Sequence, residues 1–210
     1  MNIASVRLLG LIVIGAVAYW ASVVVAMHFV EPEFNPVRVP MSAYVRGDHG
    51  AWMTTTYFVW STALLGAGCG LVRTLTRTRL TKAAFSIFLL AAAAVFVAGL
   101  FPMDFPPPVR TLSGRLHATG GLFAFPTMAL GALLFSLSFR HDASWRKLSV
   151  PALALSAGAL AVFVLAICSL LVLGFAGYAQ RVFFALLIAW MIMVGLHLTR
   201  FVPDEPRGPR

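Results

Sequence analysis

The chain has 210 residues, of which 60% are hydrophobic and only 11% are charged, and its formal net charge is +9. Soluble domains usually carry about 25% charged residues, so this composition excludes an ordinary soluble globular domain. The basic residues gather in short gaps between apolar blocks, a pattern that is typical of membrane-protein loops and argues against nucleic-acid binding.

Six apolar segments follow one another along the chain, and each is long enough to cross a bilayer as a helix. A transmembrane helix needs about 20 consecutive, predominantly apolar residues. We expect helices at residues 8–29, 52–72, 83–101, 116–139, 151–173 and 178–201. The sequence therefore predicts an all-α fold, an integral membrane six-transmembrane-helix bundle. It would form one domain over residues 1–201, with a short cytoplasmic tail at residues 202–210.

The distribution of basic residues predicts that both termini lie in the cytoplasm. The segments on the side of the termini contain eleven of the sixteen Lys and Arg residues, and the segments on the other side contain five. Cytoplasmic loops of membrane proteins carry this excess. The apolar segment after Arg7 is longer than the roughly 7–15 residues of a signal-peptide core, so we expect it to remain as the first helix.

Local signals predict how some helices begin, bend and pack. Ser149 followed by Pro151 is typical of a helix start, and Ser113 is expected to cap the fourth helix. Pro126 should kink that helix and free a carbonyl near Leu122. Small residues that let helices approach closely recur in the second and fourth helices, at Gly66, Gly70, Gly120, Gly121 and Ala124.

Polar residues concentrate in the segments that we place outside the cytoplasm, and these predict an outward-facing cleft. The segment at residues 30–51 is the longest stretch between helices, and long ordered loops are often functional. Arginine pairs well with phosphate, so three arginines are candidates for anion contacts. The candidate ligand-binding residues are Glu33, Asn35, Arg38, Ser42, Tyr44, Asp104, Arg115, His117, Gln180 and Arg181.

Asp104 is the expected partner of Arg181 or Arg115, because all three fall at the outer boundary of the bundle. Ionisable groups at membrane depth are costly and need a partner or water. One interpretation is a structural ion pair that fixes the helix ends. The other is a polar cleft that holds a lipid head group.

Three more specific kinds of site use the same residues. Ser42, His117 and Asp104 have the side chains of a nucleophile, a base and an orienting acid, although no nucleophile motif surrounds Ser42. A metal could be held by histidines with an acidic residue, and haem by two histidines. The histidines concerned are His28, His49 and His117. Because no metal-binding spacing occurs on any helix, we expect neither a metal nor a cofactor.

The motifs in residues 32–38 and 42–44 resemble the first loop of a bacterial membrane family, domain of unknown function 998. Residues 101–104 and 114–117, and the pair Gln180–Arg181, are similar to its later motifs. The resemblance implies a six-helix bundle of unassigned function, distantly similar to autophagy modulators and GPI-anchor lipid remodellers of eukaryotes. Members of the family often carry an acid after the loop serine, where this chain has Ala43.

The preferred hypothesis is a multi-pass protein of the bacterial inner membrane whose outward-facing cleft binds an amphiphile, through a lipid head group. The first alternative is a membrane-embedded enzyme that acts on a lipid-linked substrate, with His117 and Asp104 in acid–base roles. The second is a non-catalytic partner subunit of a membrane complex. The expected partners are membrane lipid and a membrane protein or a second copy of the chain, and not nucleic acid.

Overall fold

The computed structural model describes residues 2–166 and 174–202. These ranges form six long helices and two short 3₁₀ helices and contain no strand: α1 (Ile3–Val30), η1 (Met41–Arg46), α2 (Gly50–Thr74), α3 (Arg79–Leu100), α4 (Leu112–Phe139), η2 (Arg146–Leu148), α5 (Ser149–Leu165) and α6 (Ala176–Thr199). All six long helices, α5 counted together with η2, are long and apolar enough to cross a membrane. The predicted all-α transmembrane bundle is therefore confirmed. The last part of the expected fifth helix, residues 167–173, lies outside the described residues, as do residues 203–210.

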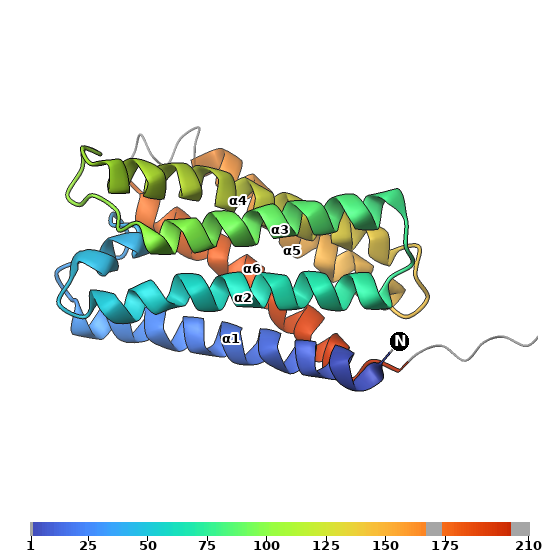
Figure 1. Ribbon diagram of the computed structural model, residues 1–210. Coiled ribbons are helices and arrows are strands. Elements are labelled where there is room, and N and C mark those ends of the chain that lie inside the picture. The colour runs from blue at the N-terminus through green and yellow to red at the C-terminus, as the bar shows by residue number, and fades with distance from the viewer. Residues whose placement is uncertain (1, 167–173, 203–210) are drawn as a thin grey trace, which may run out of the picture.

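The six helices form a closed ring, in which each helix packs against the next one along the chain and α6 returns to α1. Short connections between consecutive helices favour this antiparallel arrangement. Figure 1 shows the N-terminus and the end of α6 at one end of the bundle. The opposite end, which we call the far end, carries η1 and the connection from α3 to α4.

Aromatic side chains fill the middle of the ring, and two of the tryptophans there have hydrogen-bond partners inside it. The Trp190 indole donates to Ser136 Oγ at 2.9 Å, and the Trp60 indole donates to Met128 Sδ at 3.1 Å. Ser61 Oγ on α2 donates to the carbonyl of Ala92 on α3 at 2.9 Å. The first two bonds cross the ring, from α6 to α4 and from α2 to α4, and the third joins the neighbours α2 and α3. Inside a membrane no water replaces such partners, so these bonds hold the helices together.

The predicted close-approach faces are confirmed for most of the small residues. A side chain on Gly66 would meet Val13 of α1, and one on Gly120 would meet the Ala94 carbonyl of α3 at 3.1 Å. Gly121 is different, because a Cβ there would meet only Phe125, at 3.8 Å. Gly121 therefore does not serve helix packing, and its open side faces the cavities described below.

Two of the predicted helix starts are wrong in detail. Thr111, and not Ser113, caps α4: its Oγ1 accepts from the Gly114 amide at 2.9 Å, while the Ser113 hydroxyl donates to the Pro102 carbonyl at 2.9 Å. Ser149 is already the first residue of α5 and donates to the Arg146 carbonyl, because the 3₁₀ helix η2 leads directly into α5. Pro126 lies inside α4 as expected.

Candidate functional site

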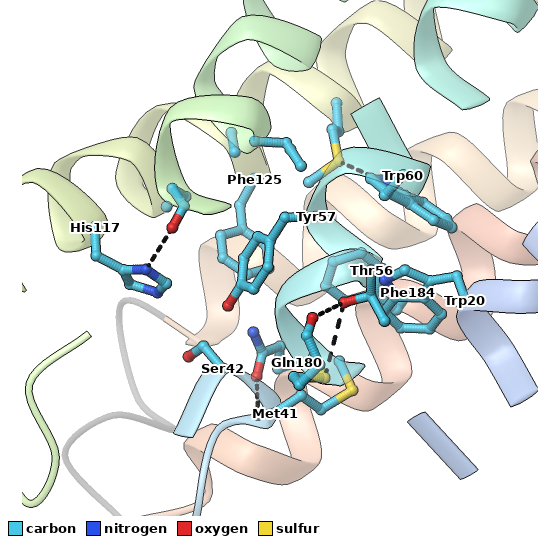
Figure 2. A pocket seen from close by; sticks show the side chains of 16 residues that line it. Trp20, Met41, Ser42, Thr56, Tyr57, Trp60, His117, Phe125, Gln180 and Phe184 are labelled. Atoms are coloured by element: carbon cyan, nitrogen blue, oxygen red, sulfur yellow. Dashed lines mark hydrogen bonds between the residues drawn. The ribbon is translucent and has the colours of Figure 1, made fainter. Parts of the chain in front are cut away.

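Two cavities lie at the far end of the bundle and share one wall. The smaller has a volume of about 70 Å³ and lies among α1, α2, α3, α4, α6 and η1. The larger, of about 470 Å³, lies between α4, α5 and α6 and reaches the loop before α4. The shared wall consists of Ser42, His117, Gly121, Phe125 and Gln180. Figure 2 shows the side chains that line the smaller cavity.

The larger cavity is apolar over most of its surface. Its polar side chains among the described residues are Ser42, Asp104, His117 and Gln180. Three of these four belong to the wall shared with the smaller cavity. Cavities of several hundred Å³ with apolar walls and a few convergent polar groups are the usual form of small-molecule sites.

The His117 ring is held in one orientation by the end of α3. Its Nδ1 lies 3.0 Å from the Ala98 carbonyl oxygen and 2.9 Å from that of Phe101. Carbonyl oxygens only accept hydrogen bonds, so Nδ1 carries the hydrogen and Nε2 of the neutral ring is an acceptor. The last carbonyls of a helix have no partner within the helix, and His117 supplies one. The ring also contacts Tyr57 edge-on, with 5.7 Å between centroids.

Gln180 completes the polar part of the shared wall, and Tyr57 lies beside it in the smaller cavity. The Gln180 Oε1 accepts from the Met41 backbone amide at 2.6 Å, which attaches η1 to α6. This bond fixes the amide so that its NH₂ group faces the cavity side, toward the Tyr57 hydroxyl (Figure 2). The Tyr57 hydroxyl points toward Ser42. Three neutral polar side chains therefore meet near His117.

The Asp104 carboxylate binds residues just before α4 in its own loop. It pairs with neither Arg115 nor Arg181, so the predicted pairing is wrong. Its carboxylate accepts from the Arg110 amide at 2.7 Å, and from the Thr111 amide and hydroxyl, each at 2.8 Å. Hydrogen bonds from Thr111 and Arg110 lower the pKa of Asp104 below its ordinary value. The backbone donors of its own loop are closer than any guanidinium, and they satisfy the charge at the start of α4.

Arg181 binds the loop between α1 and α2, and its guanidinium lines neither cavity. Nε donates to His28 Nε2 at 2.9 Å, and Nη2 donates to the Tyr44 hydroxyl at 3.2 Å. Nη1 donates to the carbonyls of Val39 and Gly177, at 3.1 Å and 3.0 Å. Burial raises the pKa of Tyr44, and the neighbouring guanidinium partly opposes this effect. Arg181 thus holds the loop on α6.

The other predicted site residues do not gather at the cavities. Asn35 Oδ1 accepts from the amides of Val37 and Arg38, at 2.9 Å and 3.3 Å, and so stabilises a turn. The side chains of Glu33, Arg38 and Arg115 are exposed and line neither cavity. Of the ten candidates, the structure brings four together at the larger cavity: Ser42, Asp104, His117 and Gln180.

A buried acid closes the loop between α1 and α2. Glu31, at 2% exposure, accepts from the His49 backbone amide at 2.6 Å and from His49 Nδ1 at 3.0 Å. Burial raises the pKa of Glu31, but the hydrogen bonds, first that from the His49 amide, outweigh burial and leave the pKa below its ordinary value. Gly47 lies directly on this carboxylate, where a Cβ would collide with it.

The proposed metal and haem arrangements do not form among the described residues. No three His, Cys, Asp or Glu side chains there lie close enough to hold a metal ion. Both ring nitrogens of His28 are engaged, Nδ1 with the Val24 carbonyl at 2.6 Å and Nε2 with Arg181. His28 is therefore unavailable as a haem ligand opposite His117.

Sequence reasoning missed several residues of the shared wall and the smaller cavity, above all Tyr57 and Gly121. Tyr57 has the signal of an interface aromatic near a helix end, and Gly121 has that of a packing glycine. Neither signal indicates a cavity. Tyr57 and Gly121 face one because η1 lies over the helix ends there.

A family model described as "Protein of unknown function (DUF998)" matches residues 13–197. The chain belongs to the DUF998 family. This match confirms the resemblance carried by the loop motifs. No curated protein and no solved structure matches the chain. DUF998 membership assigns no activity, so a function for this DUF998 protein has to be argued from its cavities.

Proposed function

We propose that this DUF998 protein binds an amphiphile at the far end of its bundle. The apolar part of the ligand occupies the larger cavity, and its polar end contacts Ser42, His117 and Gln180. The observation that carries the proposal is a cavity of about 470 Å³ whose surface is mostly apolar and whose polar groups gather on one wall. Burial of apolar surface would supply most of the affinity, and the polar wall would orient the ligand.

The surroundings of the larger cavity suit a ligand that arrives from the bilayer. Helices α4 and α5 carry large apolar side chains on their outer surfaces, with Leu122 61% exposed and Leu165 56% exposed. In a transmembrane bundle such side chains face lipid tails. Leu122 also lines the cavity, so the lipid-facing surface and the cavity wall are continuous there.

Native mass spectrometry of gently purified protein tests the proposal with two matched variants. Gly121→Leu would fill the shared wall, where a Cβ has space and then extends into both cavities. Gly15→Leu makes the same change on α1, where nothing lies within 4 Å of the new Cβ. We expect wild type and Gly15→Leu to retain a lipid, and Gly121→Leu to retain about tenfold less, a loss of about 1.4 kcal/mol of affinity. Equal retention by both variants would overturn the proposal.

One observation favours a second candidate, a membrane-embedded enzyme for lipid-linked substrates. His117 presents an acceptor nitrogen beside the hydroxyl-bearing residues Ser42 and Tyr57, an arrangement that suits a general base. Asp104 has no part in it, because its carboxylate is engaged by the loop before α4. Turnover of a retained lipid by wild type and its absence in His117→Asn would favour the enzyme. A chain that retains no lipid would favour the partner subunit.

We further propose that the protein resides in the bacterial inner membrane with both termini in the cytoplasm. The excess of Lys and Arg in the segments at the end with the termini supports this orientation. Single cysteines at Asn2 and Asp48, in a variant without Cys69 and Cys168, would test it with a membrane-impermeant thiol reagent in intact cells. We expect labelling at position 48 and not at position 2, and the reverse pattern would show the opposite orientation.

A further inference from the structure

We infer that the polar wall of the larger cavity selects an uncharged lipid whose head is a hydroxyl group, and that it discriminates against phosphate. This inference rests on the proposed function and adds the chemical class of the ligand. The arginines of the sequence suggested an anionic head group, whereas the groups that line the cavity are almost all neutral.

The hydrogen-bonding groups of the shared wall are complementary to a hydroxyl. His117 offers an acceptor at Nε2, because both carbonyls of the α3 end engage Nδ1. Gln180 offers its NH₂ donor, because Oε1 is engaged by the Met41 amide. A hydroxyl group donates one hydrogen bond and accepts others, so it can use both groups at once. The hydroxyl of Ser42 in the same wall can donate or accept, as can that of Tyr57 beside it in the smaller cavity.

The charges around the cavity disfavour an anionic head group. Among the described residues, Asp104 and His117 are the only Asp, Glu, His, Lys or Arg side chains in the lining of the larger cavity. Residues 167–173 contain no basic side chain. Arg46 is close enough to Asp104 to contribute to its lowered pKa, but it is not in the cavity lining. A phosphate in the cavity would therefore lie near the Asp104 carboxylate without an Arg or Lys side chain among the described lining residues, and a charge that leaves water without a partner is strongly disfavoured.

Arg181, which follows the lining residue Gln180, is not available for the ligand. The Arg181 guanidinium uses four hydrogen bonds to hold His28, Tyr44, Val39 and Gly177. Turning it toward the cavity would leave these groups without their partner. Arg38 and Arg115 are exposed and outside the cavity lining. The geometry therefore supports recognition through neutral hydrogen bonds.

Three lipids with identical acyl chains test the inference on the full chain in lipid nanodiscs. Dioleoylglycerol ends in a hydroxyl, its O-methyl ether can only accept a hydrogen bond, and dioleoyl phosphatidic acid adds a phosphate. We expect dioleoylglycerol to bind about tenfold more tightly than phosphatidic acid, and about fivefold more tightly than the ether, which lacks the donor to His117.

A pair of substitutions at His117 separates ligand recognition from folding. The amide nitrogen of Asn lies near the position of Nδ1, so His117→Asn keeps a donor to the α3 carbonyls and removes the acceptor. His117→Gln places its amide near the position of Nε2, so it keeps an acceptor and loses the bond to α3. We expect His117→Asn to abolish the preference for dioleoylglycerol over its ether with little change in Tm. His117→Gln should keep the preference and lower Tm.

The outcomes of this experiment distinguish the inference from the proposed function. If none of the three lipids binds, the amphiphile proposal itself fails. If all three bind equally, or phosphatidic acid binds best, the cavity holds amphiphiles and the inference about the head group is wrong. If the preference for dioleoylglycerol survives in His117→Asn, the acceptor nitrogen is not its cause.

Discussion

The α1–α2 loop, residues 31–49, and the shared cavity wall lie side by side at the far end, yet they use polar residues in opposite ways. Around the loop, Glu31 and His49 bind each other, and Arg181 of α6 binds both His28 of α1 and Tyr44 of the loop. In the wall, Ser42, His117 and Gln180 each keep a donor or acceptor that faces a cavity. At this end of the bundle, therefore, Glu31 and Arg181 hold the structure together, and the neutral side chains of the wall remain for a ligand.

The largest effect that the comparison predicts is at Arg181. Arg181→Ala removes four hydrogen bonds and leaves His28 and Tyr44 without their partner. We expect the free energy of unfolding to fall by about 2–4 kcal/mol, measured by thermal unfolding in detergent. Arg115→Ala is the control, because this exposed arginine should change stability by about 0.5 kcal/mol or less. An unchanged Tm for Arg181→Ala would remove the distinction between loop and wall.

A second effect concerns pH and the loop carboxylate. The pKa of Glu31 is lowered in the folded chain, so its stabilising contribution is present above its ordinary value near 4.5 and is lost as pH falls through the lowered folded value. Glu31→Gln should therefore cost about 1–2 kcal/mol at neutral pH, and less at a pH below both pKa values. Thermal unfolding of both proteins from pH 7 to pH 3 measures this convergence, and parallel curves would contradict it.

The smallest effect is expected on the wall. Ser42→Ala removes a hydroxyl that lines both cavities and that makes none of the hydrogen bonds by which Glu31 and Arg181 hold the loop. We expect affinity for dioleoylglycerol to fall about twofold to fivefold with Tm unchanged. Lower affinity with an unchanged Tm would support the distinction between loop and wall, because a wall residue should change ligand affinity and leave thermal stability unaltered. Loss of stability without loss of affinity would assign Ser42 to the loop.

The sequence predicts the helices well, because each must be apolar along a length set by the bilayer. It predicts the partners of individual side chains poorly. Asp104 and Arg181 have opposite charges at the same boundary, and nothing in their spacing shows that each is engaged by a different segment of backbone. Those partners depend on how the loops fold over the helix ends, which hydropathy does not encode.

Ala43 illustrates the same limit from the other direction. The family resemblance leads us to expect an acid at this position, directly after the loop serine. In this chain Ala43 is fully buried, at 0% exposure, within η1. An acid here would need a buried partner, so the alanine is explained by local packing. The sequence shows the departure, and only the structure shows its physical reason.

His117 has a consequence that extends beyond recognition, because one imidazole contacts both the cavity and the last carbonyls of α3. Occupancy of the cavity and order at that helix end are then linked thermodynamic quantities. A ligand that binds the ring in this orientation stabilises the α3 terminus. Fraying of the terminus weakens ligand binding by the same free energy. The bilayer's content of ligand would thus be read out as amide protection at the end of α3, a helix that contributes no residue to the lining of the larger cavity.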